Sequence, residues 1–465
     1  MCVTIHYMQI KPVLALLILL TAPCNVVWGQ DGDIPVDQTK QYELFNRILN
    51  DSEHFNLHFQ VTYINQTKPG MRAKYSDSLS LSAGRLNQNS VTSTLFLGGK
   101  LWKGGYVFVN PEIAGGSGLS GAQGMGGSSN GETFRVGNPA PALYLARAYF
   151  EQTFPLDDKT EKQMDDENHL DMDVPDDYLK FTVGKFSLAD MFDNNDLSNT
   201  PRTQFMNWSL MNNGAWDFAA NVRGYTYIAA AELDYSFLNY KFAVANLPKI
   251  ANGPDLNTNI SQELAINAQV AAKFNIHKLP GHASLLYFNN RADMGNYDQA
   301  LQEATTKNSI PDVIATRKRG RHKYGFGLNF EQQFPKDLGL FGRLGWNDGK
   351  NETWNFTEID KTASLGINVN GTSWHRINDV LGLAFVTNGL SKSHRAYLAA
   401  GGYGFVLGDG KLNYGAENIM EIFYNIKPTN KPLWITGDYQ LALHPGYNKD
   451  RGPANIFSLR VHTEF

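Results

Sequence analysis

Residues 55–63 read FNLHFQVTY, in which every second side chain from Phe55 to Tyr63 is apolar and the side chains between them are polar. Because side chains alternate sides along a β-strand, this stretch predicts a strand with one apolar and one hydrophilic face. The same alternation returns in residues 264–275, 323–331 and 433–444. These segments run to roughly nine to fourteen residues, longer than the five or six usual in soluble sheets.

Segments of this kind follow one another along most of the chain, with connections that alternate between short and long. About sixteen are expected, an even number. They span approximately residues 55–63, 91–101, 105–113, 142–154, 178–187, 225–233, 235–246, 263–276, 282–292, 322–334, 338–348, 356–369, 375–388, 417–427, 432–444 and 455–465.

Such strands suit a transmembrane antiparallel β-barrel whose outside meets lipid and whose inside meets water. We therefore predict an all-β fold with about sixteen strands, short periplasmic turns and long extracellular loops, over residues 55–465. A soluble β-sandwich also alternates, but its strands are shorter and its second sheet face fills a dry core.

The first 29 residues have the parts of a secretory signal: Lys11, the apolar run 12–20, and the sequence Val-Trp-Gly at 27–29. We expect cleavage after Gly29. A lipoprotein alternative at Cys24 is disfavoured by the preceding Pro23. Both cysteines lie in this segment, so we expect no disulfide in the mature chain.

Residues 30–54 are expected to form a periplasmic segment with a short amphipathic helix within 37–50. A second unusual segment, residues 155–177, carries ten acidic side chains against two lysines at a position where a short turn is expected. It is interpreted as a solvated, partly disordered turn, with loose binding of divalent cations or a partner as the alternative.

Composition and motifs argue against several classes of function. The chain has 41 basic and 45 acidic side chains, which does not favour a nucleic-acid partner. Residues 116–121 fit G-x-G-x-x-G but lack the helix and acidic residue of a dinucleotide site. We expect no catalytic residue, metal or cofactor, although a serine and a histidine from distant strands could still meet in an embedded enzyme.

The stretch from Val183 to Thr226 carries a set of recognisable sequences. It contains VGKF at 183–186, FDNN at 192–195, PRTQF at 201–205, NW at 207–208, MNNGAWD at 211–217 and RGYT at 223–226. Further matches are YLARA at 144–148, GYGF at 402–405, GDG at 408–410 and GYNKDRGP at 446–453. With these motifs the chain resembles the carbohydrate-selective porins (OprB-like).

The resemblance implies a barrel in the bacterial outer membrane through which sugars diffuse without an energy source. Its surroundings would be outer-membrane lipid and lipopolysaccharide. The alternating C-terminal strand ends at Phe465, which resembles the signal read by the barrel assembly machinery. Monomer and trimer both stay open, as do a general or ion-selective pore and a secreted β-rich carbohydrate-binding protein.

A sixteen-stranded barrel is wide enough for an aqueous channel, so selectivity needs an element that narrows it. The loop 188–224 is rich in amides, aromatics and charges, which bind sugar hydroxyls and C–H faces, and we expect it to fold into the lumen. Alternatively, its Asn, Asp and Gly residues build turns around a small core of Trp208 and Trp216. The candidate residues are Asp193, Asn194, Asn195, Arg202, Asn207, Trp208, Asn212, Asn213, Trp216, Asp217 and Arg223.

The strand 142–154 adds Arg147 and Glu151 as candidates. Strict alternation would put Leu143, Leu145, Arg147 and Glu151 on one face, turned toward water. Arg147 would then contribute to pore selectivity or be one of many wall charges.

Overall fold

The computed structural model describes residues 51–133, 139–428 and 431–465. The predicted signal peptide (1–29) and the predicted helix within 37–50 lie outside the described residues, as does most of the 30–54 segment. Within the described ranges, residues from Asp51 onward belong to one compact unit.

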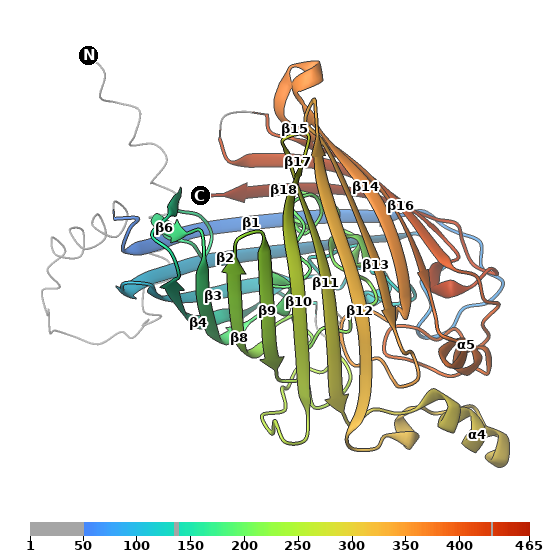
Figure 1. The fold of residues 1–465 in the computed structure, drawn as a ribbon. Helices are drawn as coiled ribbons and strands as arrows, with labels where there is room; N and C mark the ends of the chain where they lie inside the picture. Colours follow the sequence, from blue (N-terminus) through green and yellow to red (C-terminus); the bar gives the residue numbers. More distant parts are fainter. Residues whose placement is uncertain (1–50, 134–138, 429–430) are drawn as a thin grey trace, which may run out of the picture. The chain divides into compact units, whose positions relative to one another are not determined.

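Sixteen strands of the described residues pair into one closed antiparallel barrel (Figure 1). In chain order they are β1 (Phe55–Lys68), β2 (Leu86–Trp102), β3 (Gly105–Gly115), β4 (Ala142–Pro155), β7 (Tyr178–Phe186), β8 (Thr226–Tyr235), β9 (Leu238–Ala245), β10 (Leu264–Ile276), β11 (Leu279–Ala292), β12 (Arg321–Phe334), β13 (Leu338–Asn347), β14 (Lys361–Gly371), β15 (Arg376–Gly389), β16 (Glu417–Ile426), β17 (Leu433–Leu443) and β18 (Ala454–Glu464).

The barrel closes where the last strand pairs with the first. The register runs from Gln60 opposite Glu464 to Thr67 opposite Phe457, and Phe59 and Phe465 exchange backbone hydrogen bonds of 3.0 and 2.8 Å. This closure leaves the barrel without a free sheet edge, which is the condition for strands to cross lipid.

The alternation expected from the sequence sorts side chains between the two faces of the wall. On β12, Tyr324, Phe326, Leu328 and Phe330 are exposed on the outside, whereas Lys323 is fully buried on the inside. The apolar face therefore points outward and the hydrophilic face inward, as a membrane barrel requires.

The predicted strand ranges all overlap observed strands, but several boundaries differ. β1 and β2 continue beyond residues 63 and 91, and their register extends to Lys68 opposite Leu86. Backbone pairing and an amide ladder of Asn65 with Asn87 and Asn89 hold this polar extension, which hydrophobic alternation does not reveal. Conversely, residues 356–360 are not part of β14, because they belong to a buried loop.

The prediction that Leu143, Leu145 and Arg147 share a face of β4 is wrong. Asn110 pairs with Arg147 and Pro111 pairs with Leu145, so Ala146 is an extra residue that shifts the register. Leu143 and Leu145 are exposed at 67% and 42%, whereas Arg147 contacts inward-facing groups. A bulge fits here because Pro111 lacks the N–H that the ladder would need.

The acidic residues 155–177 also differ from the expected disordered turn. They contain a two-stranded sheet of β5 (Thr160–Gln163) and β6 (Met172–Pro175), with the residues between them held against the barrel. The segment is therefore paired and held by contacts, and the prediction of a solvated, partly disordered turn is wrong.

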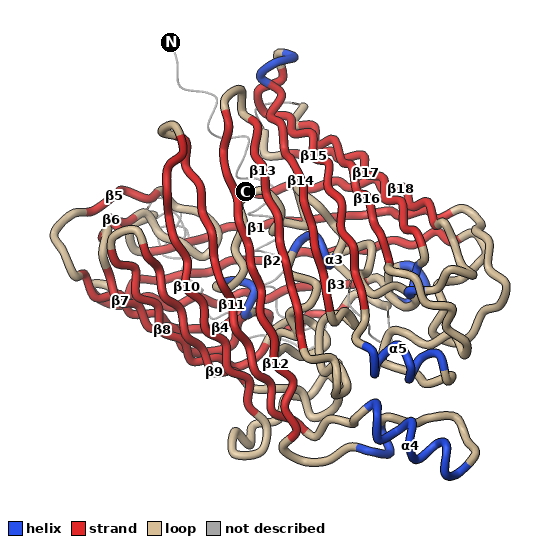
Figure 2. Tube along the Cα trace, turned by 45° about the vertical axis from the view of Figure 1, so that its right-hand side comes forward, coloured by secondary structure: helices blue, strands red, loops and turns tan. Residues whose placement is uncertain are grey.

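The α-helices of the described residues are short and lie in the long connections. They are α3 (Trp208–Met211), α4 (Tyr297–Lys307) and α5 (Lys392–Ala399), with single 3₁₀ turns at η2 (Leu119–Gly121), η3 (Leu188–Asp190), η4 (Ile314–Thr316), η5 (Thr372–Trp374) and η6 (Pro445–Tyr447). Figure 2 shows α4 and α5 near each other beyond the strands, at the end of the barrel that carries the long loops. No helix in the described ranges has the length and apolar character needed to cross a membrane.

A charge introduced into the lipid-facing belt should destabilise the barrel. Leu328 lies outward in the middle of β12, opposite Leu285 and Leu344, and all three leucines are exposed. We expect Leu328→Arg to lower the free energy of unfolding in lipid by about 2–4 kcal/mol, the cost of a cation near the bilayer midplane. Urea titration of the membrane-inserted protein measures this, and Leu328→Ala is the matched control; equal stability of both variants would contradict an outward-facing belt.

Candidate functional site

The loop that joins β7 to β8, residues 187–225, lies inside the barrel against inward-facing wall residues. Arg460 of β18 donates to the carbonyls of Pro201 and Gln204 at 2.7 and 2.8 Å. Glu421 of β16 accepts the backbone N–H of Asn207 at 3.0 Å. These contacts hold the loop against β16 and β18, which are distant from β7 and β8 around the barrel.

The central anchor of this loop is a fully desolvated ion pair. Arg343 of β13 is 0% exposed at its side chain and lies 3.0 Å from Asp193, measured from Nε to Oδ2. Its Nη1 donates to Ser198 Oγ at 2.7 Å and to the Leu210 carbonyl at 2.8 Å. Burial raises the pKa of Asp193 although Arg343 opposes the shift, so the carboxylate depends on this partner.

Amide side chains fix the loop's path. Asn195 donates to Asn329 at 2.8 Å, and Asn213 donates to the Leu344 carbonyl at 2.9 Å. A Cβ at Gly345 would lie 2.0 Å from Asn213 Oδ1, so glycine is needed for this close approach. Asn207 accepts from the N–H of Ser209 at 3.0 Å and caps α3.

Trp216 and Asp217 hold the end of the loop. Trp216 is buried against Phe192 and donates to Asn267 of β10 at 3.0 Å. Asp217 accepts the backbone N–H groups of Trp354 and Asn355 at 3.1 and 2.6 Å, which ties two loops together. Burial raises the pKa of Asp217 to about 6, with Lys323 and these donors opposing the shift.

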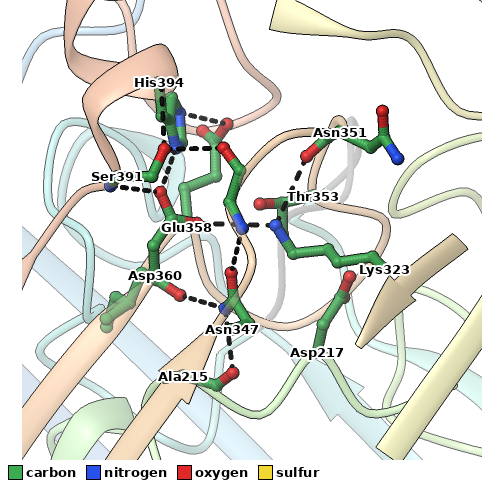
Figure 3. Close-up of polar contacts among 12 residues, drawn as sticks. Ala215, Asp217, Lys323, Asn347, Asn351, Thr353, Glu358, Asp360, Ser391 and His394 are labelled. Atoms are coloured by element: carbon green, nitrogen blue, oxygen red, sulfur yellow. Dashed lines mark hydrogen bonds and ion pairs between the residues drawn. The ribbon is translucent and has the colours of Figure 1, made fainter. Parts of the chain in front are cut away.

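A buried polar network joins further loops to the wall beside Asp217 (Figure 3). Asp360 lies 3.4 Å from Lys323 and 3.0 Å from His394, and it accepts the N–H of Ser391 at 2.8 Å. Burial raises the pKa of Asp360, but Lys323 and His394 outweigh it and hold that pKa below its usual value. Asn347 donates to the Ala215 carbonyl at 3.0 Å, which links this network to the 187–225 loop.

Between the loop and the wall lies a central cavity of about 860 Å³, within the range typical of small-molecule sites. Six predicted residues line it: Arg147, Asn194, Arg202, Trp208, Asn212 and Arg223. Asp193, Asn195, Asn207, Asn213, Trp216 and Asp217 lie behind its lining and support the loop. Glu151 faces Tyr106 and Thr182 in the β-ladder and is also outside the lining.

The three arginines of the cavity are each oriented by neighbours. Arg147 forms two bonds to Asp190, at 2.8 and 2.6 Å, beneath the ring of Tyr225. Arg202 lies 3.1 Å from Glu132 and 3.5 Å from Glu112.

Arg223 lies over the ring of Tyr144, with 4.1 Å from Cζ to the ring centroid. Tyr144 in turn donates to Glu112, which is buried on β3. The arginines are thus fixed in direction where they line the cavity.

Aromatic rings form another part of the lining. Trp208 stacks on Phe356 with centroids 5.5 Å apart and planes at 19°, and Phe218 packs against Phe356 at 4.6 Å. All three residues line the central cavity. The cavity therefore combines oriented charged donors with an aromatic surface.

Several contributors were not found by reading the sequence. Tyr144 and Tyr225 belong to the YLARA and RGYT motifs but were not predicted as site residues, and Glu112 and Phe356 lie in distant segments outside these motifs. The glycine-rich stretch before the residues 134–138 also enters the barrel, since the Asn130 carbonyl accepts from Trp208 Nε1 at 3.0 Å. Its abundance of glycine predicted a loop, but not where that loop packs.

A second cavity of about 850 Å³ lies at the end of the barrel with the short turns, which is the periplasmic end. Asn194 lines both cavities, so they meet at this exposed residue. Among the described residues, no cluster of three or more His, Cys, Asp or Glu side chains is arranged to hold a metal ion.

Removing the buried carboxylate should loosen the loop. We expect Asp193→Ala to leave Arg343 charged and unpaired, which costs about 3–5 kcal/mol. The folded band in an SDS gel should then convert to the unfolded band at a lower temperature than in the wild type. Asn194→Ala, one residue away and exposed, is the matched control; an unchanged conversion temperature for Asp193→Ala would contradict the anchor.

Residues 97–465 match the family model described as carbohydrate-selective porin, OprB family. The high-pH structure of Pseudomonas putida OprB is similar to the chain with a TM-score of 0.68 and 14% identity, over 92% of this chain and 97% of that one. The outer membrane channel DcaP of Acinetobacter baumannii gives a TM-score of 0.49 and 10% identity over 88% and 97%. Among curated proteins nothing matches the chain.

The structural similarity confirms the sixteen-stranded barrel, and the family match covers most of the chain, including the 183–226 motifs. The resemblance expected from those motifs is thereby confirmed. The chain belongs to the OprB family of carbohydrate-selective porins and is a channel of the bacterial outer membrane.

Proposed function

We propose that sugars cross the outer membrane passively through the central cavity, between the 187–225 loop and the barrel wall. The observation that carries this proposal is the lining itself, in which oriented arginines and amides occur together with the Trp208–Phe356 stack. A sugar presents hydroxyl groups that donate and accept hydrogen bonds, and C–H faces that pack on aromatic rings.

The pairing of the arginines matters for transport. Arg147 and Arg202 are already bonded to carboxylates, so each keeps only part of its hydrogen-bonding capacity for a solute. A channel must bind its solute firmly enough to admit it and weakly enough to release it. Paired charges meet both requirements for a neutral, polyhydroxylated solute.

We also propose that the channel catalyses no reaction. Ser391, His394 and Asp360 have the composition of a catalytic triad, but Ser391 Oγ accepts the backbone N–H of His394 at 3.1 Å and donates to the Gly349 carbonyl at 2.6 Å. The His394 ring and Asp360 are 0% exposed. This geometry suits a helix cap and a buried loop anchor, and it provides no nucleophile activated by the imidazole.

The C-terminal strand supports a further part of the proposal. Phe465 follows β18 directly and is bonded through its backbone to Phe59 of β1, at the seam where the barrel closes. Recognition of this terminus by the assembly machinery would bring the closing strand to its partner. Lipid and lipopolysaccharide are the surroundings proposed for the apolar outer belt.

Two substitutions test the sugar pathway. Asn212→Ala and Arg223→Gln each remove hydrogen-bonding groups from the cavity, and we expect the ratio of hexose uptake to uptake of a neutral amino acid to fall about two- to tenfold, the value of one hydrogen bond. Swelling of proteoliposomes measures both rates. Asn418→Ala, on the outer face of β16, should leave the ratio unchanged; unaltered ratios in all three folded variants would favour a general pore.

A further inference from the structure

The acidic segment, defined here as residues 156–177, has a tip, residues 165–170, that lies in the periplasmic mouth of the barrel. Asn56 of β1 is 2% exposed, and its Nδ2 donates to Asp165 Oδ1 at 2.9 Å. The same nitrogen lies 2.6 Å from the Asp166 carbonyl and 3.0 Å from the His169 carbonyl. His58, the next inward residue of β1, lies 2.9 Å from Asp165 Oδ2.

A second set of contacts fixes the tip from β3. Leu170 is 0% exposed and packs with Tyr106 and Phe108. Asn110 donates to Asn168 Oδ1 at 2.8 Å. With anchors on two strands, the tip occupies a defined place inside the mouth although its composition is that of a solvated chain.

This placement brings Asp166 and Glu167 into the lining of the central cavity. Among the described residues, the other charged side chains that line it are three arginines and three carboxylates, Glu132, Asp190 and Glu464, so their formal charges balance. Asp166 and Glu167 therefore give the described lining of the cavity an excess of negative charge.

The acidic segment also contributes to the second, periplasmic cavity. Among the described residues that line it, five are carboxylates and two are lysines. Asp157, Asp176 and Asp177 come from the acidic segment, against the single Lys159. A solute that passes Asn194 from one cavity to the other thus meets an excess of carboxylates on both sides, and most of that excess comes from this segment.

Charges of one sign along a narrow, water-filled path with low-dielectric walls concentrate counter-ions and repel like charges. We propose that the acidic segment is a charge filter of this channel, which admits neutral and cationic sugars and retards anionic ones such as sugar acids. The proposal rests on the proposed function, because it defines the substrate class of the same pathway.

The test is Asp166→Asn combined with Glu167→Gln, which removes the two charges of the tip that line the central cavity and leaves the anchoring residues Asp165, Asn168 and Leu170 in place. Proteoliposome swelling is compared for glucosamine, glucose and gluconate, and the reversal potential is measured in a KCl gradient. Because burial raises the pKa of Glu167 to about 7, these measurements are made at pH 8. We expect the wild type to favour glucosamine over gluconate and to be cation-selective, and the variant to lose at least about threefold of that preference.

The matched control is Glu161→Gln combined with Asp173→Asn. Both residues are exposed on the β5–β6 hairpin, and neither lines a cavity, so the net charge changes equally without a change in the lining. Its preference should equal that of the wild type. Migration of the folded band in SDS gels verifies that each variant has formed its barrel.

An unchanged preference in the tip variant, or an equal loss in the control, would overturn the charge filter. Failure of the proposed function has a different signature, namely no swelling of wild-type liposomes in glucose. If that occurs while the tip variant alone loses cation selectivity, the filter stands and the sugar pathway fails.

Discussion

Lipid offers no hydrogen-bonding partner to a backbone N–H or C=O group, so the sheet of this protein must close on itself. The pairing of β1 with β18 meets that requirement. Once the sheet is closed, its outer face must be apolar, and the polar half of each strand is left to face the interior. The interior can then be stable only if its polar and charged groups find water or partners, which is the task of the long loops.

The buried charges of the wall show how this works. Arg343 and Arg460 are almost completely withdrawn from solvent, and each donates hydrogen bonds to carbonyl or side-chain oxygens of the 187–225 loop. A buried charge without such partners would be strongly destabilising. The wall thus positions the loop, and the loop in turn stabilises the buried charges of the wall, so the loop is part of the fold.

The strands could be predicted because a two-residue period is a local property of the sequence. The bulge at Ala146 could not, since it depends on Pro111 lying opposite in a neighbouring strand. Asp193 and Arg343 are likewise 150 positions apart, and nothing local marks them as partners. Long-range pairing of this kind is decided by the closed topology, which a residue-by-residue pattern does not contain.

The candidate site was predictable only in part for a related reason. Asparagine and tryptophan suit both sugar contact and loop construction. Trp208 lines the cavity and Trp216 lies in the core, and only their positions in the fold decide this difference. The contacts of the arginines with tyrosine and glutamate side chains could not be predicted, because these partners come from separate strands and loops.

The acidic segment shows most clearly how position gives a charge its effect. Its composition defines the sign of the charge, but ions screen exposed charges within about 8 Å at physiological salt. A carboxylate that lies in open solvent below the mouth of the barrel therefore has little electrostatic effect on a passing solute. The contacts of Leu170 and Asn56 bring Asp166 and Glu167 to the surface of the pathway itself, where a permeating solute approaches within that distance. The contacts of one buried leucine and one asparagine thus place these charges close enough to act on a passing solute.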